Sequence, residues 1–192
     1  MTLEYYNQNA LTYATETQHL DMQAVYERFI GLLSPGATLL DLGCGSGRDA
    51  KYFKEQGMDV TAVDGSAELA ALAEKYLDQP VLVQDFLELA LPKNYEAIWA
   101  CASLLHLPKT ELPHVLQTLH AHLSQGSVFY ASFKGDKQPD GPDAKGRYFA
   151  YYDAKTLQSL FVSAGFVIKE CWTEEKPLRD HLQIWHNIIV TK

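Results

Sequence analysis

Glycines and carboxylates at the ends of two expected strands are the residues whose types and spacing point most clearly to chemistry. Asp41-Leu42-Gly43-Cys44-Gly45-Ser46-Gly47 ends a short apolar run and leads into a helical pattern. Glycines at alternate positions let the backbone turn tightly and lie against a ligand, where a Cβ would obstruct it. Asp64 ends the next apolar run, 21 residues after Gly43. An acid at about that offset in a βαβ unit accepts hydrogen bonds from ribose hydroxyls, so the pair predicts a nucleoside-type ligand.

The spacing of the glycines bears on which nucleoside ligand is meant. A dinucleotide fingerprint has the spacing G-x-G-x-x-G, with a third glycine where Arg48 stands. Here the spacing is G-x-G-x-G, which disfavours a NAD-type ligand without excluding it. Each feature also has a structural alternative, because the glycines fit a close strand-to-helix crossover and Asp64 fits a turn residue before Gly65.

The segment 41–47 resembles motif I of the class I S-adenosylmethionine-dependent methyltransferases, and Asp64 matches the ribose-binding acid of that family. Arg48-Asp49 begins the helix that follows. With these two residues, the stretch is most similar to the tellurite-resistance-like and other small-molecule branches of the family. The resemblance covers roughly residues 37–133 and extends only loosely to the two ends. It implies S-adenosylmethionine as the cofactor, S-adenosylhomocysteine as its product, and a loop that lies against the methionine end of the cofactor.

Two further strand ends match roles in the same family. Gln84-Asp85-Phe86 follows the third expected strand, where the family has an acid for the adenine amino group and a neighbour that holds the ring. The alternative is an exposed turn acid, Asp85, beside a core phenylalanine. In the family the segment at the end of the fourth strand passes beneath the cofactor, and here its small side chains leave room: Ala100, Cys101, Ala102 and Ser103.

His106 and the N-terminal tyrosines are the candidates on the acceptor side. In the family a histidine at this place often faces the acceptor, and its ordinary pKa suits a general base at neutral pH. A histidine that packs a helix start fits the sequence equally well. Tyr5, Tyr6 and Tyr13 resemble a lid over bound cofactor, or else pack a terminal helix on the domain. By resemblance, the cofactor contacts are Tyr6, Tyr13, Asp41, Gly43, Cys44, Gly45, Gly47, Arg48, Asp64, Gly65, Ser66, Gln84, Asp85, Phe86, Cys101 and Ala102.

Strand and helix patterns alternate along the chain, which indicates a parallel sheet with helices on both faces. The last two strands have no helical spacing between them and are expected to pair antiparallel. The predicted fold is therefore α/β and doubly wound, with a mostly parallel seven-stranded sheet and a C-terminal antiparallel strand pair. The expected strands are 37–42, 58–63, 81–83, 95–101, 127–133, 167–173 and 183–191, and the expected helices are 22–33, 48–56, 112–123 and the stretches that follow Ser66 and Asp153.

Three finer expectations concern a helix face, a loop and the domain organisation. Leu69, Leu72, Ala73 and Tyr76 are the expected inward face of the helix that Ser66 caps. Residues 134–147, KGDKQPDGPDAKGR, are rich in Gly, Pro and charge and predict a mobile loop. The basic residues of this loop have two interpretations. They could bind an anionic acceptor, but the favoured interpretation is that they are solvated. The whole chain, 1–192, is expected to form one methyltransferase domain, with a helical lid (1–34), a cofactor-binding core (37–133) and substrate-side elements (134–192).

Composition and charge narrow the function classes. The 192-residue chain has a formal net charge of −8, which disfavours nucleic-acid partners because these are bound by Lys and Arg. Cys44, Cys101 and Cys171 are dispersed and form no C-x-x-C pair, so neither a disulfide framework nor a zinc site is expected. No signal peptide or membrane span is expected, which together with the cysteines favours the reducing cytoplasm.

The sequence thus predicts a cytoplasmic S-adenosylmethionine-dependent methyltransferase that acts on a small molecule by in-line displacement, without a metal. A monomer is the default, with a weak homodimer as the alternative. No Asn-Pro-Pro-Tyr or Asp-Pro-Pro-Tyr follows the fourth strand, which disfavours methylation of exocyclic amines in nucleic acids or of glutamine. A protein or RNA methyltransferase and a non-catalytic cofactor-binding module remain as alternatives.

Overall fold

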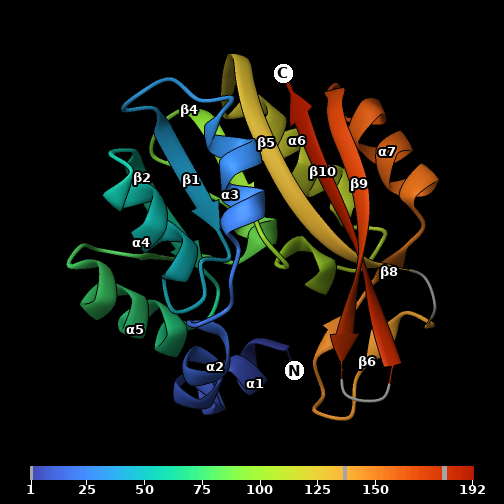
Figure 1. The fold of residues 1–192 in the computed structure, drawn as a ribbon. Helices are drawn as coiled ribbons and strands as arrows, with labels where there is room; N and C mark the ends of the chain where they lie inside the picture. Colours follow the sequence, from blue (N-terminus) through green and yellow to red (C-terminus); the bar gives the residue numbers. More distant parts are fainter. Residues whose placement is uncertain (1, 136–137, 179–180) are drawn as a thin grey trace.

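The centre of the molecule is a mixed β-sheet whose first five strands run parallel (Figure 1). The computed structural model describes residues 2–135, 138–178 and 181–192, and in them the strand order is β3-β2-β1-β4-β5-β10-β9, with β8 beside β5. β10 pairs antiparallel with both β5 and β9, which confirms the predicted C-terminal pair. The strands of this sheet are β1 (Thr38–Leu42), β2 (Asp59–Asp64), β3 (Leu82–Val83), β4 (Tyr95–Ala100), β5 (Leu123–Gly135), β8 (Tyr151–Tyr152), β9 (Val167–Leu178) and β10 (His181–Thr191).

Helices cover both faces of the sheet, as a doubly wound fold requires. Buried side chains of α3, α4 and α5 pack on one face, and those of α6 and α7 pack on the other. Two short helices, α1 and α2, lie at the end of the sheet toward which β1 points (Figure 1). The helices are α1 (Thr2–Gln8), α2 (Ala10–Thr17), α3 (Gln23–Ile30), α4 (Arg48–Glu55), α5 (Ala67–Leu77), α6 (Leu112–Ala121) and α7 (Ala154–Ser163).

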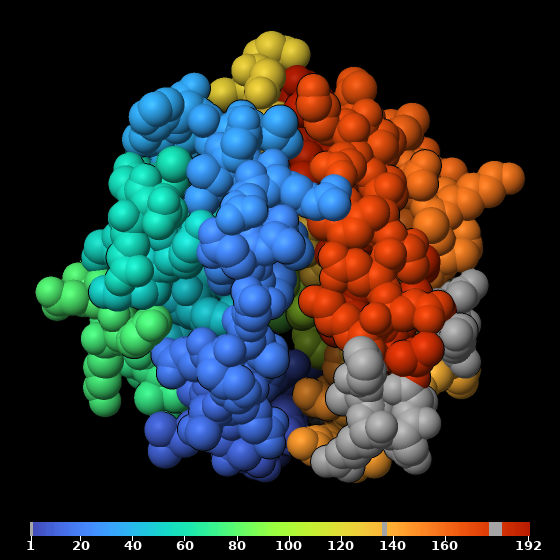
Figure 2. Space-filling view, in the orientation of Figure 1, coloured from blue at the N-terminus to red at the C-terminus, as the bar shows by residue number. Residues whose placement is uncertain are grey.

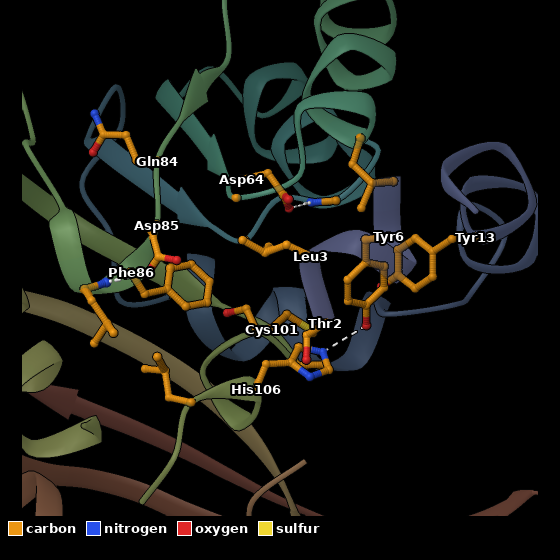
Figure 3. Close-up of a pocket in the computed structure, with 18 of the residues that line it drawn as sticks. Thr2, Leu3, Tyr6, Tyr13, Asp64, Gln84, Asp85, Phe86, Cys101 and His106 are labelled. Atoms are coloured by element: carbon orange, nitrogen blue, oxygen red, sulfur yellow. Dashed lines mark hydrogen bonds between the residues drawn. The ribbon is translucent and has the colours of Figure 1, made fainter. Parts of the chain in front are cut away.

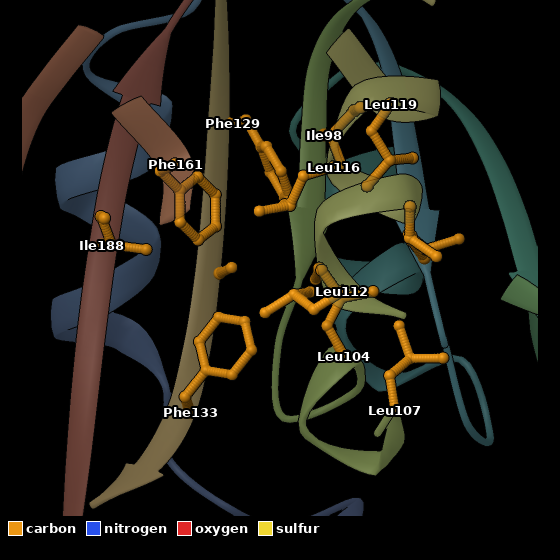
Figure 4. Packing of buried hydrophobic residues seen from close by; sticks show 14 of the residues in the cluster. Ile98, Leu104, Leu107, Leu112, Leu116, Leu119, Phe129, Phe133, Phe161 and Ile188 are labelled. Carbon is orange, nitrogen blue, oxygen red and sulfur yellow. The ribbon is translucent and has the colours of Figure 1, made fainter. Parts of the chain in front are cut away.

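The strands that carry the candidate site are buried on both faces. β1 and β4 are buried along almost their whole length, as expected for parallel strands covered by helices. On one face, Phe129 and Phe133 of β5 belong to the cluster that includes α6 and α7 (Figure 4). On the other face, Trp99 stacks on Tyr130 with ring centroids 4.1 Å apart. Each buried phenylalanine contributes about 1.5–3 kcal/mol, so the strand ends rest on a well-packed base.

The strand order reverses between β1 and β4, which are neighbours in the sheet. From β1 the chain adds β2 and β3 on one side and then β4 and β5 on the other. In open α/β sheets, ligands bind outside the carboxyl ends of the strands at such a reversal. Gly43 follows β1, Asp64 is the last residue of β2, and Cys101 follows β4. Predicted site residues from three strands therefore meet at this edge.

The helix caps are as predicted, but one helix face and one helix end differ. The Ser66 hydroxyl accepts the N–H of Leu69 at the start of α5, and Asp153 caps α7 in the same way. Tyr76, expected to face inward, is 44% exposed, and the inward face of α5 includes Ala70 and Leu77 instead. Ala70, Ala73 and Leu77 are helically spaced as well, and these three belong to the buried cluster that packs on the sheet. Leu123, expected at the end of a helix, is buried at the start of β5.

Segment 134–147 is only partly a loop, so the expectation of a loop throughout is wrong. β5 continues through Lys134, which pairs with Trp185 of β10 on one side and with Tyr151 of β8 on the other. β6 (Gly141–Pro142) and β7 (Tyr148–Phe149) form a short antiparallel pair. Residues 136–137 of this segment lie outside the described residues. No helix in the described parts of the chain is both long enough and apolar enough to cross a membrane.

Candidate functional site

A cavity of about 300 Å³, called the first cavity below, lies outside the carboxyl ends of β1, β2, β3 and β4 (Figure 3). This volume is at the lower end of the range found for small-molecule sites. The glycine loop after β1, the segments after β3 and β4, and helix α1 all contribute to its wall. The predicted site residues that line it are Tyr6, Tyr13, Gly43, Gly45, Asp64, Gly65, Gln84, Asp85, Phe86, Cys101, Ala102 and His106.

The glycine loop is fixed by its own N–H groups. Those of Gly43 and Cys44 both donate to the carbonyl oxygen of Val63, at 2.8 and 2.9 Å. That of Gly45 donates to Asp64 Oδ2 at 2.8 Å. The loop is therefore tied to the end of β2, and at these positions it offers a ligand a close backbone surface rather than free donors.

Gly43 and Gly45 have backbone conformations and surroundings that favour glycine. Both lie in the left-handed region, with φ of 78° and 57°. A Cβ on Gly43 would lie 2.4 Å from the Cβ of Ser103, which follows β4. A Cβ on Gly45 would lie 3.4 Å from the ring of Tyr13. Glycine thus lets the loop, the segment after β4 and the N-terminal helices meet around the first cavity.

Asp64 presents a carboxylate at the cavity from the end of β2. Its Oδ2 accepts the N–H of Gly45 and its Oδ1 accepts the N–H of Ser66, each at 2.8 Å. These bonds fix the carboxylate and leave further lone pairs on both oxygens. Burial raises the pKa of Asp64 to about 6, against the opposing effect of the backbone N–H groups of Ser66, Gly45 and Gly65. Hydroxyl donors of a ligand would stabilise its ionised form.

The segment after β3 supplies an aromatic face and polar groups. Asp85 precedes a 3₁₀ turn (Phe86–Glu88), and its Oδ1 accepts the backbone N–H two residues on at 2.9 Å. The Phe86 ring lies beside the glycine loop, since a Cβ on Gly43 would be 3.2 Å from its Cζ. Both amide atoms of Gln84 bond to the backbone six residues on. An aromatic face beside a carboxylate suits a heteroaromatic ring with an amino group.

The N-terminal helix α1 covers the first cavity. Leu3 lines it and lies against Gly65, where a Cβ would be 2.8 Å from the leucine Cδ2. Asn7 Oδ1 accepts the hydroxyl of Ser66 at 2.7 Å and so ties α1 to the cap of α5. Helix α1 therefore lies over this cavity, and its action as a lid stays a prediction.

His106 joins this covering segment to the loop after β4. Its Nδ1 lies 2.7 Å from the carbonyl oxygen of Tyr148 and must donate to it, so Nε2 accepts the Tyr6 hydroxyl at 2.9 Å (Figure 3). Burial lowers the pKa of His106 to about 4 and raises the pKa of Tyr6 to about 12. Tyr6 packs edge-to-face on Tyr13, with ring centroids 5.1 Å apart. At neutral pH His106 is thus an uncharged anchor for Tyr6.

A second cavity, of about 610 Å³, adjoins the first. It lies between the α2–α3 segment and strands β5, β9 and β10, where the surface is hollowed between the blue N-terminal segment and the red C-terminal strands (Figure 2). Ala102 lies between the two cavities in the left-handed region, with φ of 52°, and its N–H donates to the Ser132 hydroxyl. The residues that line both cavities are Tyr6, Tyr13, Cys101, Ala102 and His106.

Four predicted site residues lie behind the wall of the first cavity. Asp41 of β1 and Cys44 of the glycine loop are buried, and burial raises the pKa of both. Gly47 packs against α5, where a Cβ would lie 3.3 Å from that of Ala73. Ser66 caps α5. These residues shape the loop and its neighbouring helix.

Arg48 lines the second cavity rather than the first. Its guanidinium pairs with Asp49, with Nε 2.6 Å from Oδ1, and donates from Nη1 to the carbonyl oxygen of Thr17 at 3.2 Å. It therefore links the helix that follows the glycine loop to the end of α2.

Sequence reasoning missed several residues of the first cavity, because only tertiary structure brings them there. Most are ordinary apolar positions at helix starts or in turns, and no local pattern distinguishes them from core residues. They are Thr2, Leu3, Leu69, Leu87, Leu107 and Pro108. Within the described residues, no group of three or more His, Cys, Asp or Glu side chains is placed to hold a metal ion.

Comparison with known proteins places the chain in a family. Residues 13–170 match the family described as "Methyltransferase domain". The malonyl-[acyl-carrier protein] O-methyltransferase of Enterobacter lignolyticus is 29% identical over 108 residues, which are 54% of this chain and 42% of that protein. The chain spans about a third to a half of the length of the curated relatives it matches.

Two solved structures share the fold. Burkholderia thailandensis 1,6-didemethyltoxoflavin-N1-methyltransferase, with bound 1,6-didemethyltoxoflavin and S-adenosylhomocysteine, has a TM-score of 0.76 at 22% identity and covers 99% of this chain and 85% of that chain. TehB from Haemophilus influenzae has a TM-score of 0.76 at 15% identity and covers 94% and 65%. At these identities the likeness shows the fold alone. Because the family match extends over most of the chain, the protein belongs to the methyltransferase domain family, in the class I fold of the S-adenosylmethionine-dependent methyltransferases.

Proposed function

We propose that the chain transfers the methyl group of S-adenosylmethionine to a small organic acceptor. The observation that carries this proposal is the pair of adjoining cavities, one beside the glycine loop and Asp64, the other between the N-terminal segment and the C-terminal strands. A cofactor in the first and an acceptor in the second would meet at the partition formed by Cys101 and Ala102. The Burkholderia enzyme of the same fold binds both S-adenosylhomocysteine and a small acceptor, which supports a two-ligand arrangement.

The residues of the first cavity fit this cofactor. The Asp64 carboxylate has lone pairs left for ribose hydroxyls. The Phe86 ring offers a face for adenine, and Asp85 is beside it for the amino group. Backbone without side chains at Gly43 and Gly45 leaves room for the methionine portion. The N-terminal segment, 1–34, would act as the lid.

The chain's part in the chemistry is to position two reactants and exclude water. S-adenosylmethionine supplies a methyl group on a sulfonium, and its thioether leaves without acid assistance. The small side chains of Cys101 and Ala102 keep the partition narrow, and Tyr6 and Tyr13 line both cavities with them. Holding reacting atoms about 3–3.5 Å apart and in line can lower a barrier by about 7–11 kcal/mol. Positioning alone is thus sufficient for a strongly nucleophilic acceptor.

His106 is the proposed base for an acceptor that enters with a proton. It lines both cavities, and its Nε2 is the nitrogen that carries the lone pair. To act as a base, Nε2 must first release its hydrogen bond with the Tyr6 hydroxyl and then accept the proton of the acceptor. Because its pKa is about 4, it would take a proton only from an acceptor that becomes acidic as the new bond forms.

Incubation with methyl-labelled S-adenosylmethionine and a metabolite extract tests the proposal. We expect the label in a product of low molecular weight. Label in acid-precipitable material would indicate a protein or RNA acceptor instead. Binding of S-adenosylhomocysteine without any transfer would indicate a non-catalytic module. Either result contradicts the proposed function.

We also propose that the chain acts as a monomer in the cytoplasm. Cys44, Cys101 and Cys171 are free, which suits a reducing compartment. Residues of a single copy line both cavities, so the proposed chemistry needs no partner chain. Light scattering that gave a stable dimer would contradict the proposed state.

A further inference from the structure

The floor of the second cavity is one face of the C-terminal half of the sheet. Side chains alternate along a strand, so Ser132 and Lys134 of β5 share a face, as do Trp185 and Asn187 of β10. The register sets Ser132 opposite Asn187 and Lys134 opposite Trp185. All four line the second cavity. The basic residue that the sequence assigns to a solvated loop therefore stands inside a binding cavity.

Lys134 is half-buried, and among the described residues it has no anionic partner. Its Nζ lies 3.5 Å from the centroid of the Phe149 ring, and Arg147 lies against the same ring at 5.1 Å. Arg147 is paired with Asp143 at 2.6 Å, whereas no described carboxylate lies within ion-pair distance of Lys134. Burial and the nearby Arg147 lower the pKa of Lys134 to about 8, and the charge of Asp143 opposes this shift. The ammonium form still prevails at neutral pH, and an anion beside it would stabilise it further.

A neighbouring wall residue has a hydrogen-bond donor without an acceptor. Asn187 is only 3% exposed, and its Oδ1 accepts the Tyr130 hydroxyl at 2.7 Å. Its Nδ2 has no partner among the described residues. A buried amide donor without an acceptor is unfavourable. Asn187 lies opposite Ser132, whose hydroxyl accepts the N–H of Ala102, so this donor is near the partition, and a ligand oxygen there would relieve the cost.

The rest of the wall suits a flat and mostly apolar molecule. Trp185 and Phe149 contribute aromatic side chains, and Val25 and Leu105 contribute aliphatic ones. The volume of about 610 Å³ is in the usual range for small organic ligands. Glu174 and other carboxylates also line the cavity, which disfavours a second negative charge on the ligand.

Given the methyl transfer proposed above, on which this step rests, we infer that the acceptor is a flat, largely apolar molecule with one carboxylate, and that Lys134 binds this carboxylate in the second cavity. One ammonium without an ion-pair partner matches a single carboxylate, and two register positions separate Lys134 from Ser132, which bonds to the partition. The group that accepts the methyl would lie at the other end of the molecule, toward the partition of Cys101 and Ala102.

Binding of benzoate and of benzamide to the protein saturated with S-adenosylhomocysteine tests this inference. The two probes share a ring and differ in charge. By calorimetry we expect benzoate to bind about tenfold more tightly than benzamide, because it forms a charge-assisted hydrogen bond with Lys134. Lys134→Met keeps the apolar stem and removes the charge, so it abolishes this preference and leaves the affinity for S-adenosylhomocysteine unchanged.

Lys109→Met is the matched control. The Lys109 Nζ also lies near an aromatic ring, 5.0 Å from the centroid of Tyr152, but it is paired with Asp140 and lines neither described cavity. This variant should keep the preference for benzoate. If Lys134→Met loses its cooperative thermal unfolding, Lys134→Gln replaces it.

Three outcomes overturn the inference: equal affinity of the wild type for both probes, no binding of either probe, or a preference for benzoate that survives the loss of the Lys134 charge. Failure of the wild type to bind S-adenosylhomocysteine would overturn the proposed function itself. Because the cofactor product is titrated separately before the probes, the two failures are distinguishable.

Discussion

Asp64 is the residue on which the proposed cofactor site depends most. It is buried, and its carboxylate is held by two backbone donors while lone pairs remain on both oxygens. Burial raises its pKa to about 6, so it takes up a proton just below neutral pH. Ribose hydroxyls would stabilise the carboxylate, whereas the protonated acid offers fewer acceptor positions. Cofactor binding should therefore be coupled to the release of one proton from Asp64.

We expect the affinity for S-adenosylhomocysteine to fall as the pH falls through about 6. The ligand prefers the ionised form, so each pH unit below the pKa costs up to about tenfold in affinity. Asp64→Asn removes the titration and should flatten the profile, with a loss of roughly 1–3 kcal/mol of binding at neutral pH. Calorimetry over a pH series measures both effects. Asp78→Asn, at an exposed position after α5, is the control, and a profile in Asp64→Asn that matched the wild type would remove Asp64 from the site.

Residues at strand ends could be predicted from sequence, because their roles follow from local position. Asp64 and Asp85 follow apolar runs, and both line the first cavity. The place of Lys134 in a strand could not be predicted, because its local composition resembles a loop and only the ladders to β8 and β10 make it part of β5. Leu3 carries no local signal at all, since its place in the cavity depends on how α1 docks.

At the scale of elements, the loop after β1 and the segment after β4 approach each other closely at Gly43. Gly43 and Gly126 both have φ of 78°, so an alanine at either position costs about 1–2 kcal/mol from the backbone alone. At Gly43 the new Cβ would also lie 2.4 Å from that of Ser103, whereas at Gly126 nothing lies within 4 Å.

We expect Gly43→Ala to lower the free energy of unfolding by roughly 1–3 kcal/mol more than Gly126→Ala, because only the first variant overpacks the site. Chemical denaturation of the two variants measures the difference. Equal losses would show that the two segments are not in close contact in solution.

The contact between α1 and α5 is expected to control release of the cofactor. Asn7 Oδ1 accepts the Ser66 hydroxyl and, at 3.3 Å, the N–H of Glu68. Asn7→Ala removes this acceptor. A hydrogen bond contributes about 1 kcal/mol to the stability of the closed state, so we expect S-adenosylhomocysteine to dissociate about fivefold faster from the variant. Gln8→Ala removes only a bond within α1 and should change nothing. Stopped-flow fluorescence measures the rates, and the same rate in both variants would argue against a lid.

Element types follow from periodicity, and element boundaries follow less well. The alternation of apolar runs identifies the parallel strands, but Leu123 continues the helical spacing of α6 although it begins β5. The pairing of β6 with β7 involves two residues on each side, which is too short for any period to be seen. On α5, Tyr76 and Leu77 are both apolar, so sequence spacing alone does not decide which of them turns inward.

At the scale of the whole molecule, the N-terminal segment and the C-terminal strands meet across the second cavity (Figure 2). Arg28 of α3 pairs with Glu170 of β9, and its guanidinium lies 4.8 Å from the ring centroid of Trp172. The doubly wound core could be predicted from the alternation of elements. The second cavity could not, because it is formed by parts of the chain that are far apart in sequence and that carry no motif.

The central claim is that a nucleoside cofactor occupies the first cavity and faces an acceptor in the second. A crystal structure with S-adenosylhomocysteine tests it most directly. We predict density in the first cavity, with the ribose at Asp64, the adenine beside Phe86 and the sulfur toward Cys101 and Ala102. Density at another place, or no density at saturating ligand, would contradict the claim.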